Sequence, residues 1–358
     1  MRIPTLVATA LAAVTTAAVL GGPASAAQAT DSARAAADIV KIPISFHVKN
    51  TNNTDDYCQY NADGRDYTVR GVVIGPKKAI AAGKAATLYL HAVTWTSEYF
   101  NLPISGHNYA EEMAKRGHVS IAVDRLGYGK SDRVPGLATC FGSEADILHQ
   151  EVQALKSGNY TLGTGKPAAF GKVFTSGASV GGLIANIEAY TFHDTAGVYN
   201  QSWGDWSAGP YALQEAFSAN YRCYNGGDDY KDGYGPNEYA TFASSSRDEF
   251  WFASATPDVR SHVPAMQPDP CGQIMNLPFA IGTDMQHLGM IDVPVLMTFG
   301  DADPVFPAPS AQQMQARYSG SPKVTNVNIP GASHYPILEA NFPVMVDAAN
   351  AWLNENGG

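Results

Sequence analysis

Hydrophobic and polar residues alternate along two segments near the start of the chain, 39–48 and 67–74, and β-branched residues are frequent in both. A period of two residues is typical of a β-strand that buries one face. The polar stretch between them, 50–65, suits a long turn. The pattern therefore predicts two antiparallel strands at the edge of a sheet.

From residue 86 onwards, short apolar runs alternate with amphipathic stretches, which is the signature of parallel βαβ units. The predicted strands are 87–90, 119–123, 173–175, 197–200, 293–299 and 324–329, and the predicted helices are 109–116, 143–156, 179–190 and a terminal helix through Trp352. Together they predict an α/β protein with a doubly wound, mostly parallel sheet.

The alternation fails between residues 203 and 286, in a segment rich in aromatic residues, Gly, Asp and Ser. Long unpatterned segments of compact domains are usually functional, and open α/β sheets bind ligands at the carboxyl ends of their strands. We therefore predict that 203–286 is a cap or lid on a core formed by 39–202 and 287–358. Ordinary surface elaboration is the alternative.

The start of the chain has the features of a secretory signal over residues 1–27. Arg2 supplies a positive charge, 6–20 is an alanine-rich apolar run, and 24–26 has the small-x-small form of a cleavage site. The apolar run is too short for a membrane anchor. We expect a secreted protein whose mature N-terminus, 28–38, is flexible.

Composition narrows the range of partners. Of the 358 residues, 45% are hydrophobic and 16% are charged, so the chain can bury a large core. The formal net charge is −10 and the basic residues are scattered, which disfavours nucleic acid and anionic membranes as partners. We expect no nucleic-acid partner and no stable membrane anchoring.

Cysteines follow the signal at positions 58, 140, 223 and 271. An even number in an exported protein indicates disulfides, and four cysteines allow three pairings. We favour Cys58 with Cys140 and Cys223 with Cys271, because the last two share the 203–286 segment. The absence of CxxC spacing disfavours a metal or redox site.

The run G-A-S-V-G at 177–181 is a G-x-S-x-G motif centred on Ser179. It follows a predicted strand and precedes a predicted helix. A sharp turn of this kind exposes the serine hydroxyl at the helix N-terminus and requires small neighbours, and the helix dipole favours negative charge that develops there. The motif predicts that Ser179 is a nucleophile.

Two further motifs follow at the carboxyl ends of later predicted strands, G-D-A-D-P at 300–304 and G-A-S-H-Y-P at 331–336. A serine hydroxyl is a weak nucleophile that needs a base near pH 7, a role suited to imidazole. A carboxylate then fixes the imidazole tautomer and stabilises the imidazolium. We therefore predict His334 as the general base and Asp303 as the acid.

These motifs make the chain similar to the α/β-hydrolase superfamily over nearly all of its length after the signal. The run 124–132 resembles the family's D-x-x-G-x-G-x-S-D segment, 300–303 its G-x-x-D turn, and 331–336 its G-x-x-H-[FY]-P turn. The resemblance implies the α/β-hydrolase fold and a Ser, Asp, His order. It keeps Asp301 as a reserve acid and Asp205 as a third candidate.

The resemblance also implies an oxyanion hole. One donor is the backbone amide of Val180, and the other lies just beyond the third strand, where the family has His-Gly and this chain has His91-Ala92. By position, Val93 is the second donor and Ala92 the weaker candidate. Alanine narrows the backbone angles that this loop can adopt.

Serine at the elbow disfavours epoxide hydrolases and dehalogenases, which generally carry aspartate there, and fits acyl transfer. The sequence predicts a secreted carboxylic ester hydrolase that needs no cofactor and acts on a small apolar or aromatic substrate. An amidase or peptidase with the same triad and a non-catalytic binding protein are the alternatives. Nine aromatic residues are predicted to suit the pocket: Trp95, Tyr99, Phe100, Trp203, Trp206, Tyr211, Tyr221, Trp251 and Phe252.

Overall fold

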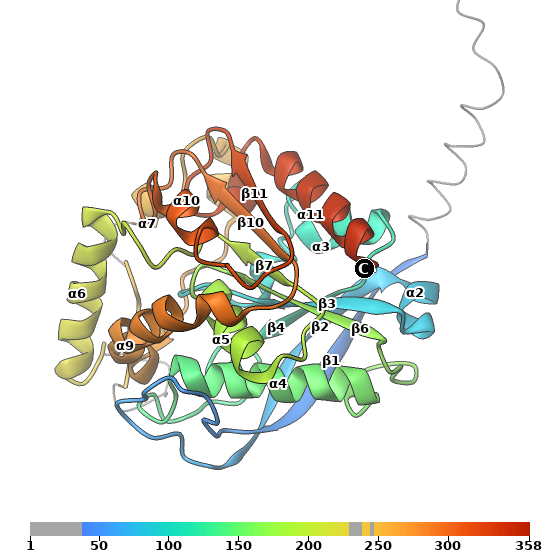
Figure 1. Ribbon diagram of the computed structural model, residues 1–358, viewed down its shortest axis with the longest axis horizontal. Helices are drawn as coiled ribbons and strands as arrows, with labels where there is room; N and C mark the ends of the chain where they lie inside the picture. The colour runs from blue at the N-terminus through green and yellow to red at the C-terminus, as the bar shows by residue number, and fades with distance from the viewer. Residues whose placement is uncertain (1–37, 229–237, 244–246) are drawn as a thin grey trace, which may run out of the picture.

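A computed structural model describes residues 38–228, 238–243 and 247–358 (Figure 1). The predicted signal 1–27 and residues 28–37 lie outside the described residues. The strands of the main sheet are β1 (Ile39–Lys49), β2 (Asp66–Pro76), β3 (Ala85–Leu90), β4 (Ser120–Asp124), β5 (Thr161–Leu162), β6 (Lys172–Ala178), β7 (Val198–Gln201), β10 (Val295–Gly300) and β11 (Val324–Ile329).

These strands form one nine-stranded sheet in the order β11-β10-β7-β6-β3-β4-β2-β1-β5. Neighbours from β11 to β4 are parallel, whereas β2, β1 and β5 continue the sheet in antiparallel pairing. The predicted antiparallel edge and the mostly parallel α/β sheet are therefore confirmed. The parallel strands β3, β4, β6 and β10 are almost wholly buried, which is why apolar and small residues occupy most of their positions.

Helices cover both faces of the sheet (Figure 1). Those outside the 203–286 segment are α2 (Lys77–Ala82), α3 (Tyr109–Lys115), α4 (Phe141–Ser157), α5 (Val180–Phe192), α10 (Ser310–Gln315) and α11 (Phe342–Asn356). Helices α3 and α11 pack together on one face, and α4 and α5 pack together on the other. This arrangement brings the carboxyl ends of β6, β7 and β10 to one edge, where the predicted site residues lie.

The 203–286 segment contains more regular structure than its sequence pattern indicates. Its elements are α6 (Pro210–Tyr224), β8 (Tyr239–Ala240), α7 (Arg247–Trp251), α8 (Pro257–His262), β9 (Asp269–Pro270) and α9 (Cys271–His287). Helix α6 escapes prediction because it buries small side chains such as Ala219, while Phe217 and Tyr221 are 74% and 72% exposed. That reversal removes the usual apolar stripe facing the core.

Both preferred disulfides are present. Cys58 is linked to Cys140, and Cys223 to Cys271, so one bond ties the loop after β1 to the start of α4 and the other joins α6 to α9. In the part of the chain that the structure describes, no helix has the length and apolar character that a bilayer crossing requires.

Several buried carboxyl groups predict a stability that depends on pH. Burial raises the pKa of Asp56, Glu144 and Asp205 to about 7 and that of Glu188 well above its usual range. The folded state therefore holds protons that the unfolded chain has already released, because unfolded carboxyl groups titrate near pH 4. This stabilisation is lost as pH rises through about 7.

We expect the melting temperature to fall by several degrees between pH 6.5 and pH 8.5, which differential scanning fluorimetry can measure. Glu188→Gln removes one of these groups and should flatten the slope. The buried imidazole His91, whose pKa is lowered by burial, destabilises the fold only at lower pH and does not oppose the trend. A melting temperature that rises with pH in this window contradicts the prediction.

Candidate active site

Ser179 lies at the turn between β6 and α5, as the motif predicts. Its backbone has φ 52° and ψ −123°, in a region that residues other than glycine rarely occupy. Glycines make the turn possible, because a Cβ at Gly177 would collide with the backbone of Gly181, and one at Gly181 with the carbonyl of Leu90. The Ser179 N–H donates to Gln201 O (2.8 Å), which ties the turn to β7.

His334 and Asp303 form a buried pair. The distance between His334 Nδ1 and Asp303 Oδ2 is 2.9 Å, and both side chains are completely inaccessible to solvent. Asp303 Oδ1 accepts hydrogen bonds from the backbone N–H groups of Val305 (2.7 Å) and Phe306 (3.2 Å). The carboxylate is therefore fixed in place before it contacts the imidazole.

Aromatic rings enclose the His334 imidazole. The Phe250 ring stacks on it with centroids 5.0 Å apart, and the Phe306 ring lies at 5.8 Å. His334 Nε2 is buried and has no hydrogen-bond partner among the described residues. With Nδ1 turned to Asp303, Nε2 is the nitrogen left available to exchange a proton.

The two other acid candidates have different partners. Asp301 is exposed, and its Oδ1 accepts a hydrogen bond from the N–H of Gly331 (2.6 Å). Asp205 Oδ1 accepts one from Trp203 Nε1 (3.0 Å). The carboxylate that the structure brings to His334 is that of Asp303.

A cavity of about 100 Å³ opens beside the elbow, bordered by Ser179 and by both predicted oxyanion residues, Val180 and Val93. Its remaining wall is mostly apolar and includes Phe141, Trp203, Leu213, Phe242, Phe250, Ile274, Leu277, Ile281, Val305 and Phe306. Phe250 and Phe306 also contact His334. The imidazole therefore lies directly behind the wall of the cavity that Ser179 borders.

The prediction for the nine aromatic residues is largely wrong. Among the described residues that line the cavity, Trp203 is the one member of that group. Trp95, Tyr99 and Phe100 instead pack into the protein interior, and Tyr221 faces solvent. Composition located an aromatic-rich region, but which rings turn toward Ser179 depends on how the 203–286 segment folds.

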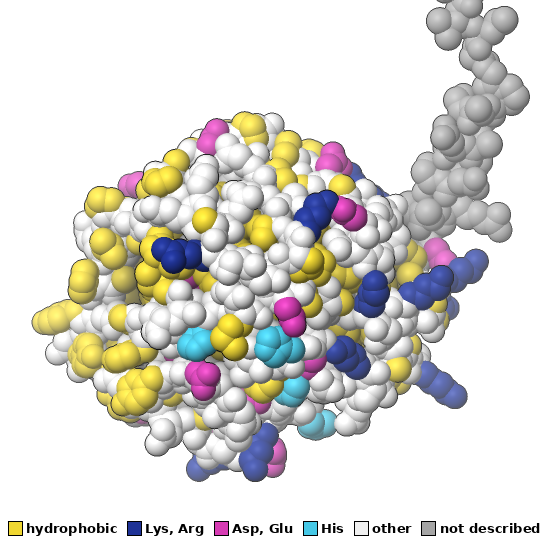
Figure 2. All heavy atoms as spheres, in the orientation of Figure 1, with side chains coloured by type: hydrophobic (Ala, Val, Ile, Leu, Met, Phe, Trp, Pro, Cys, Tyr) yellow, Lys and Arg dark blue, Asp and Glu magenta, His cyan; other side chains and the backbone are white. Residues whose placement is uncertain are grey.

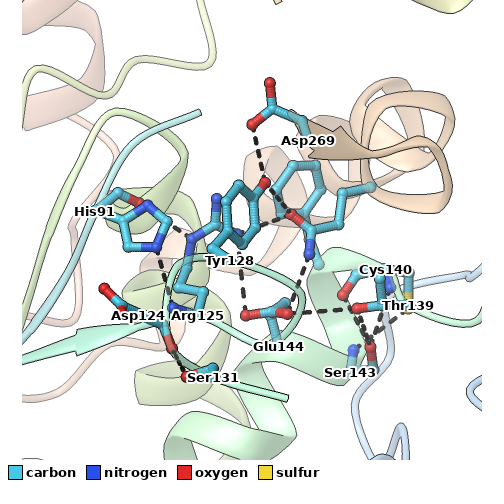
Figure 3. Close-up of polar contacts among 12 residues, drawn as sticks. His91, Asp124, Arg125, Tyr128, Ser131, Thr139, Cys140, Ser143, Glu144 and Asp269 are labelled. Atoms are coloured by element: carbon cyan, nitrogen blue, oxygen red, sulfur yellow. Dashed lines mark hydrogen bonds and ion pairs between the residues drawn. The ribbon is translucent and has the colours of Figure 1, made fainter. Parts of the chain in front are cut away.

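The loop after β3 is held by a network of side chains around His91. His91 Nδ1 lies 2.8 Å from Ala92 O, and the N–H of Arg125 donates to His91 Nε2 (3.0 Å). His91 therefore carries its proton on Nδ1. Burial, assisted by the positive charge of Arg125, holds the pKa of His91 well below its usual range. Figure 3 shows this imidazole in a buried network with Arg125, Tyr128, Glu144 and Asp269.

Glu339 is another functional candidate without a sequence motif. It is fully buried and accepts hydrogen bonds from the N–H groups of Ala253 (2.7 Å), Ser254 (2.7 Å) and Ser333 (3.1 Å). It thereby joins the histidine turn to the stretch that follows Phe250. The sequence does not indicate that Glu339 links these two segments, because they come together only in the folded protein.

Among the residues that the structure describes, two groups of side chains have a donor set that a metal ion could use. One contains Asp56 with Cys58 and Cys140, but those cysteines form a disulfide. The other contains His149, Glu188 and Asp194, of which Glu188 lies near the end of α5 remote from Ser179. His149 Nδ1 already pairs with Asp194 Oδ2 at 2.8 Å. Neither group borders the cavity beside Ser179.

Solved structures share this architecture. A thermophilic esterase from Thermogutta terrifontis superposes with a TM-score of 0.57 at 20% identity, over 87% of this chain and 99% of the other. A monoacylglycerol lipase from Paleococcus ferrophilus gives 0.54 at 18% identity, over 75% and 94%. Est1E from Butyrivibrio proteoclasticus, solved with ferulic acid bound, gives 0.52 at 16% identity, over 83% and 98%.

A search of curated protein sequences found no significant match. The model of the alpha/beta hydrolase family, however, matches residues 88–348, a stretch that begins in β3 and ends within α11. This match covers most of the sheet, the turn at Ser179 and the His334–Asp303 pair. The chain therefore belongs to the alpha/beta hydrolase family.

Proposed function

We propose that the protein is a secreted serine hydrolase that cleaves carboxylic esters. The observation that carries the proposal is the cavity shared by Ser179 and the rings that enclose His334, with Asp303 behind the imidazole. Esterases and a lipase among the structures with this fold support the reaction class. The two disulfides support export.

In the proposed reaction, Ser179 Oγ attacks the ester carbonyl carbon while His334 Nε2 takes the hydroxyl proton. The oxygen that becomes negative is held by the backbone N–H groups of Val180 and Val93. When the intermediate collapses, the alcohol leaves with the proton from His334, and an acyl group remains on Ser179. A water molecule, deprotonated by His334, then attacks the acyl-enzyme, and His334 returns this proton to Ser179 Oγ as the bond to the acyl group breaks and the acid is released.

The 203–286 segment acts as the cap in this proposal. It supplies much of the cavity wall, including Trp203, Leu213, Phe250 and Ile274. An apolar wall favours an apolar substrate group, and burial against it strengthens electrostatic interactions at the elbow.

A series of p-nitrophenyl esters tests the proposal, and the dependence of kcat/KM on acyl-chain length shows which chain length the cavity accepts. We expect hydrolysis of the acetate and butyrate with much higher kcat/KM than the dodecanoate. The reason is that a cavity of about 100 Å³ accommodates a short acyl chain more readily than one of twelve carbons. The matched p-nitroanilides separate an esterase from an amidase, because amine release is the harder step.

A fluorophosphonate probe should label the protein, and peptide mass spectrometry should map the label to Ser179. An intact protein that neither hydrolyses the esters nor takes up the probe rejects the enzymatic proposal and favours the non-catalytic binding alternative. Equal turnover of anilides and esters favours the amidase alternative.

A further inference from the structure

Thr94, which directly follows the proposed oxyanion donor Val93, has an unusual backbone conformation. Its φ is 63°, in the left-handed region that a β-branched residue rarely adopts. It is also completely buried. Surrounding contacts must therefore hold this peptide in place.

Those contacts come from the proposed cap. The N–H of Thr94 donates to Asp269 Oδ1 (2.7 Å), and its carbonyl accepts from the N–H of Gln267 (2.7 Å). The next residue, Trp95, stacks its ring on Trp251 with centroids 4.3 Å apart. The loop that carries Val93 is thus attached to the 203–286 segment.

Asp269 is itself held rigidly. Its Oδ1 also accepts from the hydroxyl of Tyr128 (2.9 Å), and its Oδ2 accepts from the N–H of Phe242 (3.1 Å). The side chain is 0% exposed. In Figure 3 its carboxyl group points toward Tyr128 from the cap side of the network. Burial raises the pKa of Asp269 to about 6, and the three donors that converge on the carboxylate oppose this rise, so the group is mainly ionised above neutral pH.

We propose that Asp269 is a positioning residue for ester hydrolysis. By holding the Thr94 peptide, its carboxylate sets the direction of the preceding N–H, that of Val93, toward the oxyanion. This inference rests on the function proposed above. It also accounts for the position of the strain in this loop, which falls at Thr94: the contacts from the 203–286 segment hold a β-branched residue in a conformation that glycine adopts more easily.

The test compares Asp269→Ala and Asp269→Asn in the full mature protein with p-nitrophenyl acetate. An oxyanion donor acts in the transition state, so displacing it lowers kcat and leaves KM nearly unchanged. We expect a loss of about 100-fold in kcat for Asp269→Ala, similar to the loss of one oxyanion donor. Asp269→Asn should lose less, because its amide oxygen can still accept from Thr94.

Two further measurements separate positioning from misfolding. Fluorophosphonate labelling to completion counts the intact sites, so that kcat is expressed per labelled serine. A trifluoromethyl ketone provides the second readout: Ser179 Oγ adds to the ketone carbon, the serine proton passes to His334, and the ketone oxygen becomes an oxyanion. Its affinity should fall in parallel with kcat.

Asp56→Asn is the matched control. Asp56 is likewise a buried carboxylate that accepts a backbone hydrogen bond, from Gly142 (2.8 Å), but it does not border the cavity. Its kcat should stay at the wild-type value.

Asp269 borders the cavity, so a rise in KM at constant kcat in its variants would assign it to direct substrate contact and overturn the positioning role. Unchanged kcat and ketone affinity would overturn it as well. A wild-type protein that is inactive and unlabelled would instead mark the failure of the proposed function.

Discussion

Ser179→Ala should lower kcat for p-nitrophenyl acetate by at least about 10⁴-fold, because no acyl-enzyme can form without the hydroxyl. The proposed oxyanion amides and the cavity persist in the variant, so a small residual rate above the uncatalysed reaction is expected. The measurement is steady-state hydrolysis per mole of folded protein, with fluorophosphonate uptake as a second readout. The variant should take up no probe at position 179.

Ser176→Ala is the matched control. Ser176 lies on β6, the strand that leads into Ser179, is fully buried, and donates a hydrogen bond to Tyr199 O (2.9 Å) without bordering the cavity. It should retain activity at a temperature where it is folded. If Ser179→Ala kept a substantial fraction of wild-type turnover, the serine mechanism would be wrong.

Asp303→Asn is expected to lower kcat by about 10⁴-fold, the cost of the equivalent change in a serine protease triad. An amide at this position can donate to His334 Nδ1, which favours the wrong imidazole tautomer. It also cannot stabilise the imidazolium as a carboxylate does. The backbone bonds from Val305 and Phe306 to Oδ1 can persist, so the fold around the turn should survive.

Asp301→Asn and Asp205→Asn serve as the comparison, because both residues are acid candidates from the sequence. Neither should approach the loss seen for Asp303→Asn, since their side chains bond to Gly331 and Trp203 instead of His334. Measuring all three variants with one substrate at one pH decides the assignment. A larger loss for Asp205→Asn would transfer the role of the acid to that residue.

The sequence predicts those parts of the molecule that depend on neighbours along the chain. Ser179 needs small residues beside it because the turn is sharp, and the candidate acid and histidine follow strands whose carboxyl ends must meet at one edge. The central strands β3, β4 and β10 are recognisable because burial on both faces favours apolar residues, and β1 and β2 are recognisable by their alternation.

Residues that act through distant contacts leave no such pattern. Asp269 and Phe250 meet Thr94 and His334 only after the 203–286 segment folds onto the core. Helix α6 reverses the usual periodicity, with Ala219 inside and Phe217 outside, so no sequence window indicates it. For the same reason the aromatic prediction identified a region of the chain and misjudged the rings that line the cavity.

The bond between Cys223 and Cys271 has a thermodynamic consequence for the site. It closes a loop of 48 residues, and a cross-link of that span removes about 4 kcal/mol of chain entropy from the unfolded state in the loop-closure model. Cys271 follows Asp269 by two residues, so the same restriction reduces the freedom that Asp269 must lose on folding. The 203–286 segment can then hold a buried carboxylate at a fixed position beside the cavity.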